Sequence, residues 1–239
     1  MKIALKRARS ARSCGHSMRL FAPVLLCASF AAAFAQQPVT IRVDASRRLG
    51  SFKPVWNFFG YDEPNYTYTE NGSRLIRELA ELSETPVQIR THNLLTTGSG
   101  MSGLKWGSTN AYTEDASGGP VYDWTLTDKI FDTYLRAGAK PFVEIGFMPK
   151  ALSSQPEPYA PVWKTPADFG KYFLGWSYPP KDYQKWSELV YQWVEHCSRK
   201  YGKSEVETWS WEVWNEPISA IGMARLRSTK NCMTSLLRR

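Results

Sequence analysis

The sequence predicts an α/β fold in which parallel strands alternate with helices, as in the first four strand–helix units of a (β/α)8 TIM barrel. Apolar runs with strand character occupy residues 55–61, 87–92, 140–147 and 207–214. Segments with helical spacing of apolar residues lie between them, at residues 69–83, 127–138 and 182–201. This alternation favours right-handed crossovers between parallel strands. An open doubly wound sheet is the alternative, but no glycine-rich phosphate loop follows the first strand.

In the first half of the body, residues 39–43 alternate apolar and polar side chains and predict a short lead-in strand. The helix at 69–83 places Leu and Ile residues at a spacing of about 3.6, with Glu70 near its start. After the strand at 87–92, the Gly/Ser/Thr-rich stretch 93–120 predicts a long loop. Loops of that length in a compact domain are usually functional or mobile.

In the second half, Thr127 is expected to cap a helix and Gly138 to end it. Another long loop, residues 148–180, follows the strand at 140–147 and is rich in Pro and aromatic residues. The helix at 182–201 is closed by Gly202. The last predicted strand ends at Asn-Glu-Pro, where Pro cannot donate a ladder hydrogen bond.

Residues 1–35 have the composition of a secretory signal peptide. A basic, irregular lead is followed by an apolar run at 20–34 that is too short for a membrane span. The run ends Ala33-Phe34-Ala35, which fits the small-x-small cleavage rule. The sequence therefore predicts cleavage after Ala35, a secreted or periplasmic protein, and no membrane association once the peptide is removed. Met18 is an alternative start.

The formal charge of +8 comes from the two ends of the chain. Residues 1–35 hold six basic residues and no acid, residues 218–239 hold five and no acid, and the rest has 19 basic against 22 acidic residues. This distribution argues against a nucleic-acid partner. Only Cys197 lies in the body, which predicts a free buried thiol and no disulfide framework. The 10 Trp residues suit either sugar stacking or a packed core.

Polar residues lie at the carboxyl end of each predicted strand: Asp62 and Glu63, then Arg90 and His92, then the region 147–150, and then Asn215 and Glu216. Carboxyl ends of parallel strands meet on one rim, so these groups are expected to converge. Two interpretations of Glu216 stay open at this point, a catalytic acid or a turn residue. A lone His at a strand end is more often structural. No metal-binding or triad spacing is present, and no cofactor or metal is predicted.

Four segments, in order, resemble glycoside hydrolase family 39, the β-xylosidase and α-L-iduronidase group. They are Trp-Asn-Phe-Phe-Gly at 56–60, Ile-Arg-Thr-His at 89–92, Pro-Phe-Val-Glu-Ile-Gly-Phe-Met-Pro at 141–149 and Trp-Glu-Val-Trp-Asn-Glu-Pro at 211–217. The resemblance covers residues 39–217 and implies retaining hydrolysis of a carbohydrate by two carboxylates about 5–5.5 Å apart. It implies these roles: Glu216 as acid/base, Asn215 as partner of the sugar 2-hydroxyl, His92 as a hydroxyl ligand, and Trp56, Phe147 and Trp214 as pocket wall.

The resemblance also implies a nucleophilic Glu on a later strand, and this chain ends 23 residues after Glu216 without it. Residues 218–239 break in composition from the body, and back-translation of these residues, read one base earlier, permits a continuation like that of the family. We therefore expect residues 36–217 to be the N-terminal half of the barrel and residues 218–239 to be an out-of-frame tail. A divergent natural C-terminus is the alternative.

A half barrel exposes a sheet edge and should fold poorly. The predicted activity is that of a retaining β-xylosidase, which this chain would lack without the nucleophile. The alternatives are an α-L-iduronidase or another glycosidase of the same clan, and a non-catalytic sugar-binding remnant.

Overall fold

The structure is a computed structural model that describes residues 39–47, 49–51, 55–101, 107–160 and 174–216. The predicted signal peptide at 1–35 and the predicted out-of-frame tail at 218–239 lie outside these residues. The chain divides into two units, residues 1–51 and 52–239. Among the described residues, no helix has the length and apolar character needed to cross a membrane.

In the first unit, the predicted lead-in strand at 39–43 is wrong. These residues have no strand structure, and Val39, Ile41 and Val43 are 82–87% exposed. Alternating side chains favour a strand only where a neighbouring strand supplies a ladder and a core buries one face. The described residues of this unit supply neither.

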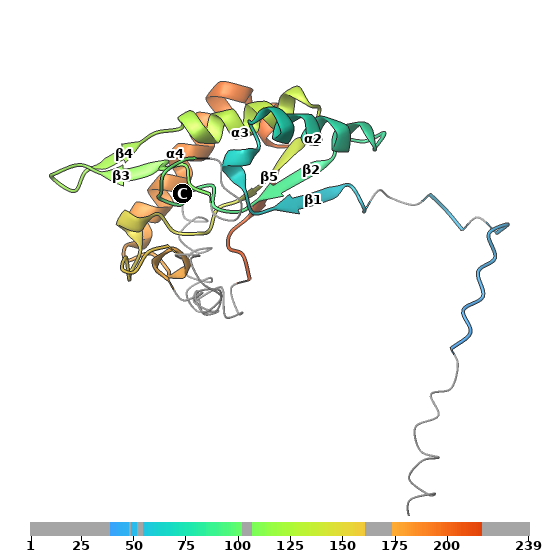
Figure 1. Ribbon diagram of the computed structural model, residues 1–239, viewed down its shortest axis with the longest axis horizontal. Coiled ribbons are helices and arrows are strands. Elements are labelled where there is room, and N and C mark those ends of the chain that lie inside the picture. Colours follow the sequence, from blue (N-terminus) through green and yellow to red (C-terminus); the bar gives the residue numbers. More distant parts are fainter. Residues whose placement is uncertain (1–38, 48, 52–54, 102–106, 161–173, 217–239) are drawn as a thin grey trace, which may run out of the picture. The chain divides into compact units, whose positions relative to one another are not determined.

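The second unit is built on a four-stranded parallel sheet with the order β1-β2-β5-β6 (Figure 1). The strands are β1 (Phe58–Tyr61), β2 (Gln88–Thr91), β5 (Lys140–Glu144) and β6 (Ser210–Glu212). All three strand pairs are parallel. The predicted α/β class with a parallel sheet is confirmed, although each strand is shorter than its apolar run.

Three helices were predicted within the second unit, and all three are confirmed: α2 (Glu70–Glu81), α3 (Thr125–Arg136) and α4 (Tyr183–Tyr201). Thr69 caps α2 by accepting a hydrogen bond from the Gly72 amide at 3.1 Å. Helix α4 follows a cap by Asp182 and ends at Gly202.

The cap of α3 differs from the prediction. The helix begins at Thr125, and Thr127 donates its hydroxyl to the carbonyl of Trp124 from within the first turn. Asp123 accepts from the Thr125 amide at 2.9 Å and satisfies one of the free N–H groups there. The predicted stop at Gly138 is confirmed, with φ of 78°, a conformation that glycine adopts without strain.

The predicted loop at 93–120 contains most of a hairpin that periodicity did not reveal. Strand β3 (Tyr112–Glu114) pairs antiparallel with β4 (Pro120–Tyr122), and the hairpin projects from the body (Figure 1). Strands of three residues are too short to show a period of two. The other short elements are η2 (Pro64–Tyr66), η3 (Lys150–Leu152), η5 (Gly175–Ser177) and α5 (Lys203–Val206).

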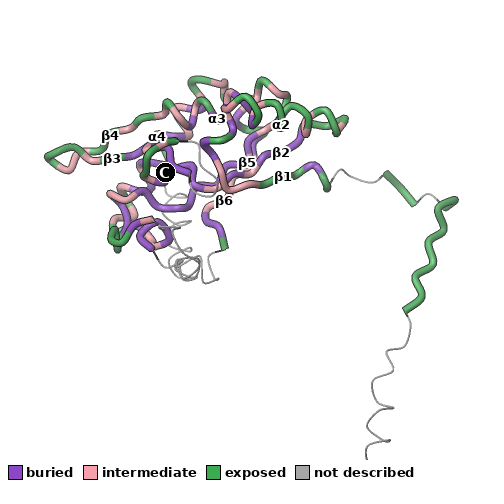
Figure 2. The backbone as a smooth tube through the Cα atoms, viewed as in Figure 1, coloured by how far each residue is buried: buried purple, intermediate pink, exposed green. Residues whose placement is uncertain are grey.

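The core lies between the sheet and the helices, and β2 and β5 are its most deeply buried strands (Figure 2). Phe131 of α3 stacks on Trp193 of α4 at 5.9 Å and meets Trp209 edge-on at 5.1 Å. Cys197 is buried and free, as predicted. Buried tryptophans are Trp176, Trp186, Trp193, Trp209 and Trp214. At least half of the 10 Trp residues therefore belong to the packed core.

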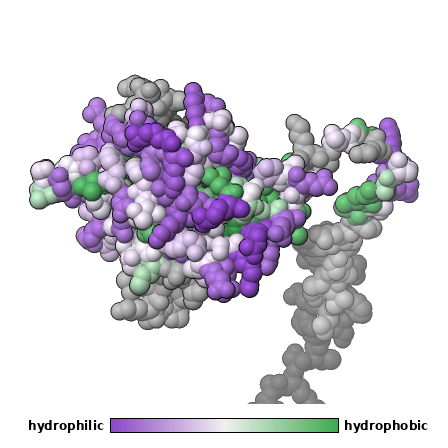
Figure 3. All heavy atoms as spheres, turned by 90° about the horizontal axis from the view of Figure 1, so that it is seen from above, coloured by the Kyte–Doolittle hydropathy of each residue, from purple (hydrophilic) through white to green (hydrophobic). Residues whose placement is uncertain are grey.

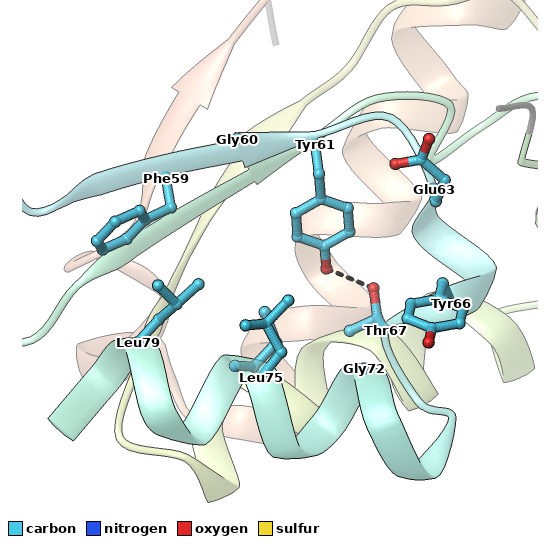
Figure 4. Close-up of a pocket in the computed structure, with 10 residues that line it drawn as sticks. Phe59, Gly60, Tyr61, Glu63, Tyr66, Thr67, Gly72, Leu75 and Leu79 are labelled. Atoms are coloured by element: carbon cyan, nitrogen blue, oxygen red, sulfur yellow. Dashed lines mark hydrogen bonds between the residues drawn. The ribbon is translucent and has the colours of Figure 1, made fainter. Parts of the chain in front are cut away.

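Both edge strands of the described sheet border an apolar groove. One groove, of about 450 Å³, lies between β1 and α2 and is lined by Phe59, Tyr61 and Leu75 among others (Figure 4). The other, of about 390 Å³, is lined by residues of β6 and α4 and their neighbours. Hydrophobic side chains also reach the surface (Figure 3), and near β1 they include Phe58, which is 50% exposed.

Candidate functional site

Strand alternation gathers charged side chains on one face of the sheet, opposite the face that carries Ile89 and Val143. Arg90 pairs with Phe142 in the β2–β5 register, and Glu144 pairs with Glu212 in the β5–β6 register. Their neighbours Ile89 and Val143 are completely buried. Because successive side chains of a strand point to opposite faces, Arg90, Glu144 and Glu212 share one face near the carboxyl ends of the strands.

Arg90 is the centre of this group. Its Nε donates to Glu212 Oε2 at 2.5 Å and its Nη2 donates to Glu212 Oε1 at 3.0 Å, a bidentate pair. Nη2 also donates to Asn215 Oδ1 at 2.9 Å and lies 3.2 Å from Glu144 Oε2. Burial works against the charge of Arg90, but the Glu212 hydrogen bonds and the charges of Glu144 and Glu212 raise its pKa overall.

His92 joins the same group through both ring nitrogens. Nε2 lies 2.5 Å from Arg90 Nη1, and Nδ1 lies 3.4 Å from Glu144 Oε2. A guanidinium only donates, so Nε2 must accept and the ring proton must sit on Nδ1, facing Glu144. The carboxylate of Asp62, after β1, lies 3.6 Å from Nε2. We call Arg90, His92, Glu144, Glu212 and Asn215 the Arg90 network.

Glu144 is the member that water does not reach, with a side-chain exposure of 0%. Burial raises the pKa of its carboxyl well above the ordinary value. Arg90 acts in the opposite direction, and the negative charges of Glu212 and Asp62 add to the increase. Within the described part of the chain, neither Glu144 oxygen has a well-formed hydrogen bond. Burial therefore disfavours the charged form of Glu144, and the neighbouring Arg90 opposes this effect.

Asn215 and Glu216 follow β6 directly, at the carboxyl end of the strand. Asn215 is buried and Glu216 is exposed. Glu216 has φ of 42°, a left-handed conformation that costs free energy for a residue other than glycine. The next residue is Pro217, which further restricts the backbone of Glu216. Conformations of this cost are concentrated at functional sites.

Phe147 and Trp214 lie beside the network, each only 3% exposed. Phe147 packs edge-on against Trp176 at 4.2 Å and Trp214 at 6.2 Å, and it lies 6.0 Å from the His92 ring. A Cβ on Gly146 would lie 2.7 Å from the Trp214 ring, so glycine is needed for this packing. The two aromatic rings are covered by protein, and Phe147 lies beside the His92 ring of the network.

Trp56 is separated from the other predicted site residues. It lies before β1, at the amino end of the strand, and is 54% exposed. The whole of β1 lies between it and Asp62, which follows the strand. The structure therefore brings together His92, Phe147, Trp214 and Asn215 and leaves Trp56 at the opposite end of the strand.

The sequence reasoning did not select Glu144 and Glu212 as site residues. Both lie inside quoted motifs, and each interrupts an apolar strand at a position that alternates with a core residue. A charge in the middle of a buried strand needs a partner, and that signal could have identified both residues. Among the residues the structure describes, no group of His, Cys, Asp or Glu is arranged to hold a metal.

A parallel α/β sheet with acids at the carboxyl ends of its strands is an arrangement in which glycoside hydrolases hold their paired carboxylates. The sequence profile of glycosyl hydrolases family 39 matches residues 39–220, and the chain belongs to this family.

Three relatives show the extent of the similarity. The chain is 44% identical over 98 residues to a beta-xylosidase of Geobacillus stearothermophilus, which covers 41% of this chain and 17% of that protein. It is 41% identical over 90 residues to a beta-xylosidase of Caldicellulosiruptor saccharolyticus, covering 38% and 16%. The crystal structure of a monomeric beta-xylosidase from Caulobacter crescentus matches with a TM-score of 0.58 and 25% identity, covering 76% of this chain and 33% of that one. The matched parts thus span a third or less of each relative's length.

Proposed function

We propose that this chain carries the acid/base half of a retaining β-xylosidase. The observation that carries the proposal is the place of Asn215 and Glu216, directly after the last of four sequential parallel strands and next to the Arg90 network. The family and the names of the similar proteins support the choice of a β-xyloside as substrate.

The fold in this proposal is the first half of a (β/α)8 barrel. The strands follow one another in sequence order and pair in parallel. The edge strands β1 and β6 each border an apolar groove. These features support a sheet whose remaining strands continue from both edges, as closure into a barrel requires.

The proposed mechanism divides the work between two carboxylates. Glu216 protonates the oxygen of the leaving group and then, as a base, takes a proton from the attacking water. Asn215 donates a hydrogen bond to the sugar 2-hydroxyl, an interaction that strengthens in the transition state. The second carboxylate attacks the anomeric carbon and belongs to a later strand. Glu216 and Asn215 alone therefore do not complete the proposed hydrolysis.

An assay of the 239-residue chain on an aryl β-xyloside tests this division. We expect no turnover above that of a Glu216→Ala variant, and binding of methyl β-xyloside by both proteins. Turnover that disappears in Glu216→Ala would overturn the proposed inactivity. Sugar binding that persists while the complete, frame-restored protein is also inactive would instead support a non-catalytic sugar-binding protein.

The coding DNA tests the proposed frame change near Pro217. We expect the shifted frame after this codon to encode further strand–helix units, including a Glu at the end of a later strand. The frame-restored protein should hydrolyse aryl β-xylosides. Its Glu216→Ala variant should lose activity most strongly on xylosides with poor leaving groups, because these need protonation by the acid. An early stop codon in the shifted frame would refute the frame change.

Export is the remaining part of the proposal. Sequencing of the mature N-terminus from the periplasm or medium should find Gln36 as the first residue, which is the product of cleavage after Ala35. An intact N-terminus on a cell-retained protein would contradict it.

A further inference from the structure

The four-stranded sheet has two edges, and among the described residues neither edge has a neighbouring strand. Strand β1 pairs only with β2, and β6 pairs only with β5 (Figure 1). The outer side of each edge strand therefore presents main-chain N–H and C=O groups for which the described part of the chain supplies no strand partner. Both edges are places where a further strand can add to the sheet.

Each edge also carries one of the two apolar grooves on the helix side of the sheet. In the groove between β1 and α2, Leu75 is 51% exposed and lies with Leu79 opposite Phe59 (Figure 4). In the groove between β6 and α4, Tyr191 is 46% exposed beside Val194. A large apolar side chain left half exposed next to an open strand edge is the surface that another strand–helix unit covers in an α/β fold.

The rest of the 239-residue chain is too short to cover both edges. Closure of four strands into an eight-stranded barrel needs four further strand–helix units, about 125 residues or half of a typical barrel. Residues 217–239 are fewer than one such unit, which takes about 30 residues. A second copy of the chain carries four units of the required kind.

A second copy also meets the two edges with the strand direction that the sheet requires. Rotation by a half-turn about the axis of the barrel keeps every strand of both copies parallel, and it places β1 of each copy beside β6 of the other. The surfaces that meet are different ones, so each contact leaves one groove of each copy for the second contact. Four strands from each copy make the eight of a closed barrel, so the assembly ends at two copies.

We propose that the 239-residue chain forms a two-fold homodimer in which β1 and α2 of each copy pack against β6 and α4 of the other, closing an eight-stranded parallel barrel. The closure rests on the half barrel of the proposed function, whereas hydrolysis plays no part in it. The two-fold axis places the two copies of Glu216 four strands apart on the rim, and a retaining pair of carboxylates needs a separation of about 5–5.5 Å. The dimer therefore leaves the chain inactive.

Sedimentation equilibrium of the 239-residue chain measures the assembly, and we expect wild type at twice the mass of one chain. Leu75→Glu and Tyr191→Glu should each raise the dimer dissociation constant by about a hundredfold, because each homodimer then holds an unpaired charge in both apolar contacts. Val121→Glu is the matched control. Val121 is an apolar residue of β4 that is 44% exposed and lines neither groove, so this variant should remain a dimer.

Mixing two variants tests which edges meet. Leu75→Lys and Tyr191→Glu should each be monomeric alone, with helix content checked by circular dichroism. In a mixed dimer one contact joins the new lysine to the new glutamate and the other contact is that of wild type, so the mixture should dimerise. A dimer that joined β1 to β1 would respond to Leu75→Lys and ignore Tyr191→Glu.

A monomeric wild type, an assembly larger than two copies, or a mixture that stays monomeric would overturn the proposed dimer. These outcomes are distinguishable from failure of the proposed function. If the 239-residue chain is monomeric and the frame-restored protein hydrolyses aryl β-xylosides, the dimer fails and the function stands. If the mixed variants dimerise and the frame-restored protein is inactive, the function fails and the dimer stands.

Discussion

The Arg90 network and the interface of α3 with α4 contain the same kinds of side chain and differ in burial. The interface holds a cluster of Asp128, Asp132, His196, Lys200 and Tyr201, which we call the helix cluster. Asp128 lies 2.8 Å from His196 and 3.0 Å from Lys200, and Asp132 lies 3.1 Å from Lys200. Tyr201 donates to Asp132 at 2.9 Å. Each acid of the helix cluster therefore has at least two partners.

The helix cluster and the Arg90 network differ in how far water reaches their acidic side chains. The Asp, His and Lys side chains of the helix cluster are 20–33% exposed, so water shares in their solvation. In the Arg90 network, Glu144 has an exposure of 0% and lies between Arg90 and His92 without a well-formed hydrogen bond among the described residues. In the helix cluster, acidic, basic and His side chains thus form a partly solvated contact between two helices. Enforced burial of an acid is what marks the Arg90 network as a candidate site.

The largest expected effect is that of Arg90→Met, which leaves Glu144 and Glu212 without their cation. Loss of one partner from a buried ion pair costs about 3–5 kcal/mol, because an uncompensated charge stays in a poorly solvated place. Urea unfolding at neutral pH, followed by circular dichroism, measures the loss in free energy of unfolding.

Lys200→Met in the helix cluster is the matched control, with the same substitution of a cation by a linear apolar side chain. It should cost at most about 1 kcal/mol, since the partly exposed acids keep water as a partner. Equal losses in the two variants would show that burial does not separate the two groups.

The fold was predictable from the sequence where local signals and packing agree. Helix α2 has a capping Thr69 and a regular apolar stripe, and α4 has a capping Asp182 and a closing Gly202, so both helices were predicted close to their observed bounds. The β3–β4 hairpin was missed because its strands are too short for a period. Residues 39–43 show the opposite error, since alternation alone does not supply a partner strand.

The site was predictable only in part. Glu216, Asn215 and His92 were selected because they follow predicted strands, and parallel pairing brings strand ends together. Glu144 and Glu212 were treated as strand interior. The side chains that balance the charge of Arg90 are set by the register between strands that lie far apart in the sequence, and the sequence does not show this register. Trp56 precedes its strand, and its placement depended on where β1 begins.

Glu144→Gln tests the state of the buried acid through pH. The pKa of Glu144 is raised in the folded protein above its ordinary value of 4.5, so folding favours the protonated form. Its contribution to stability is present in full below about pH 4.5 and is lost as pH rises through the folded pKa. Relative to wild type, Glu144→Gln should therefore gain up to about 1.4 kcal/mol per pH unit in this window.

The groups that face Glu144 also titrate or carry charge, namely Arg90, His92, Glu212 and Asp62. They are present in both proteins, so the difference between the two stability curves isolates Glu144 to first order. Asp128→Asn is the comparison in the helix cluster, and it should lose stability at neutral pH because it removes a charge that Lys200 pairs. A constant difference between Glu144→Gln and wild type from pH 5 to 8 would mean that Glu144 is ionised throughout.

The smallest expected effect is the salt dependence of the stability cost of each substitution, which should differ between the Arg90 network and the helix cluster. The Lys200 pairs lie at the surface, where ions screen charges over a length of about 3 Å at 1 M salt and about 10 Å at 0.1 M. The cost of Lys200→Met, at most about 1 kcal/mol at low salt, should therefore shrink toward zero in 1 M NaCl. The cost of Arg90→Met should persist, because Glu144 is closed to solvent and ions. Paired unfolding curves at the two salt concentrations measure both differences, and an equal response of the two variants would remove the distinction between a solvated helix contact and a buried charge network.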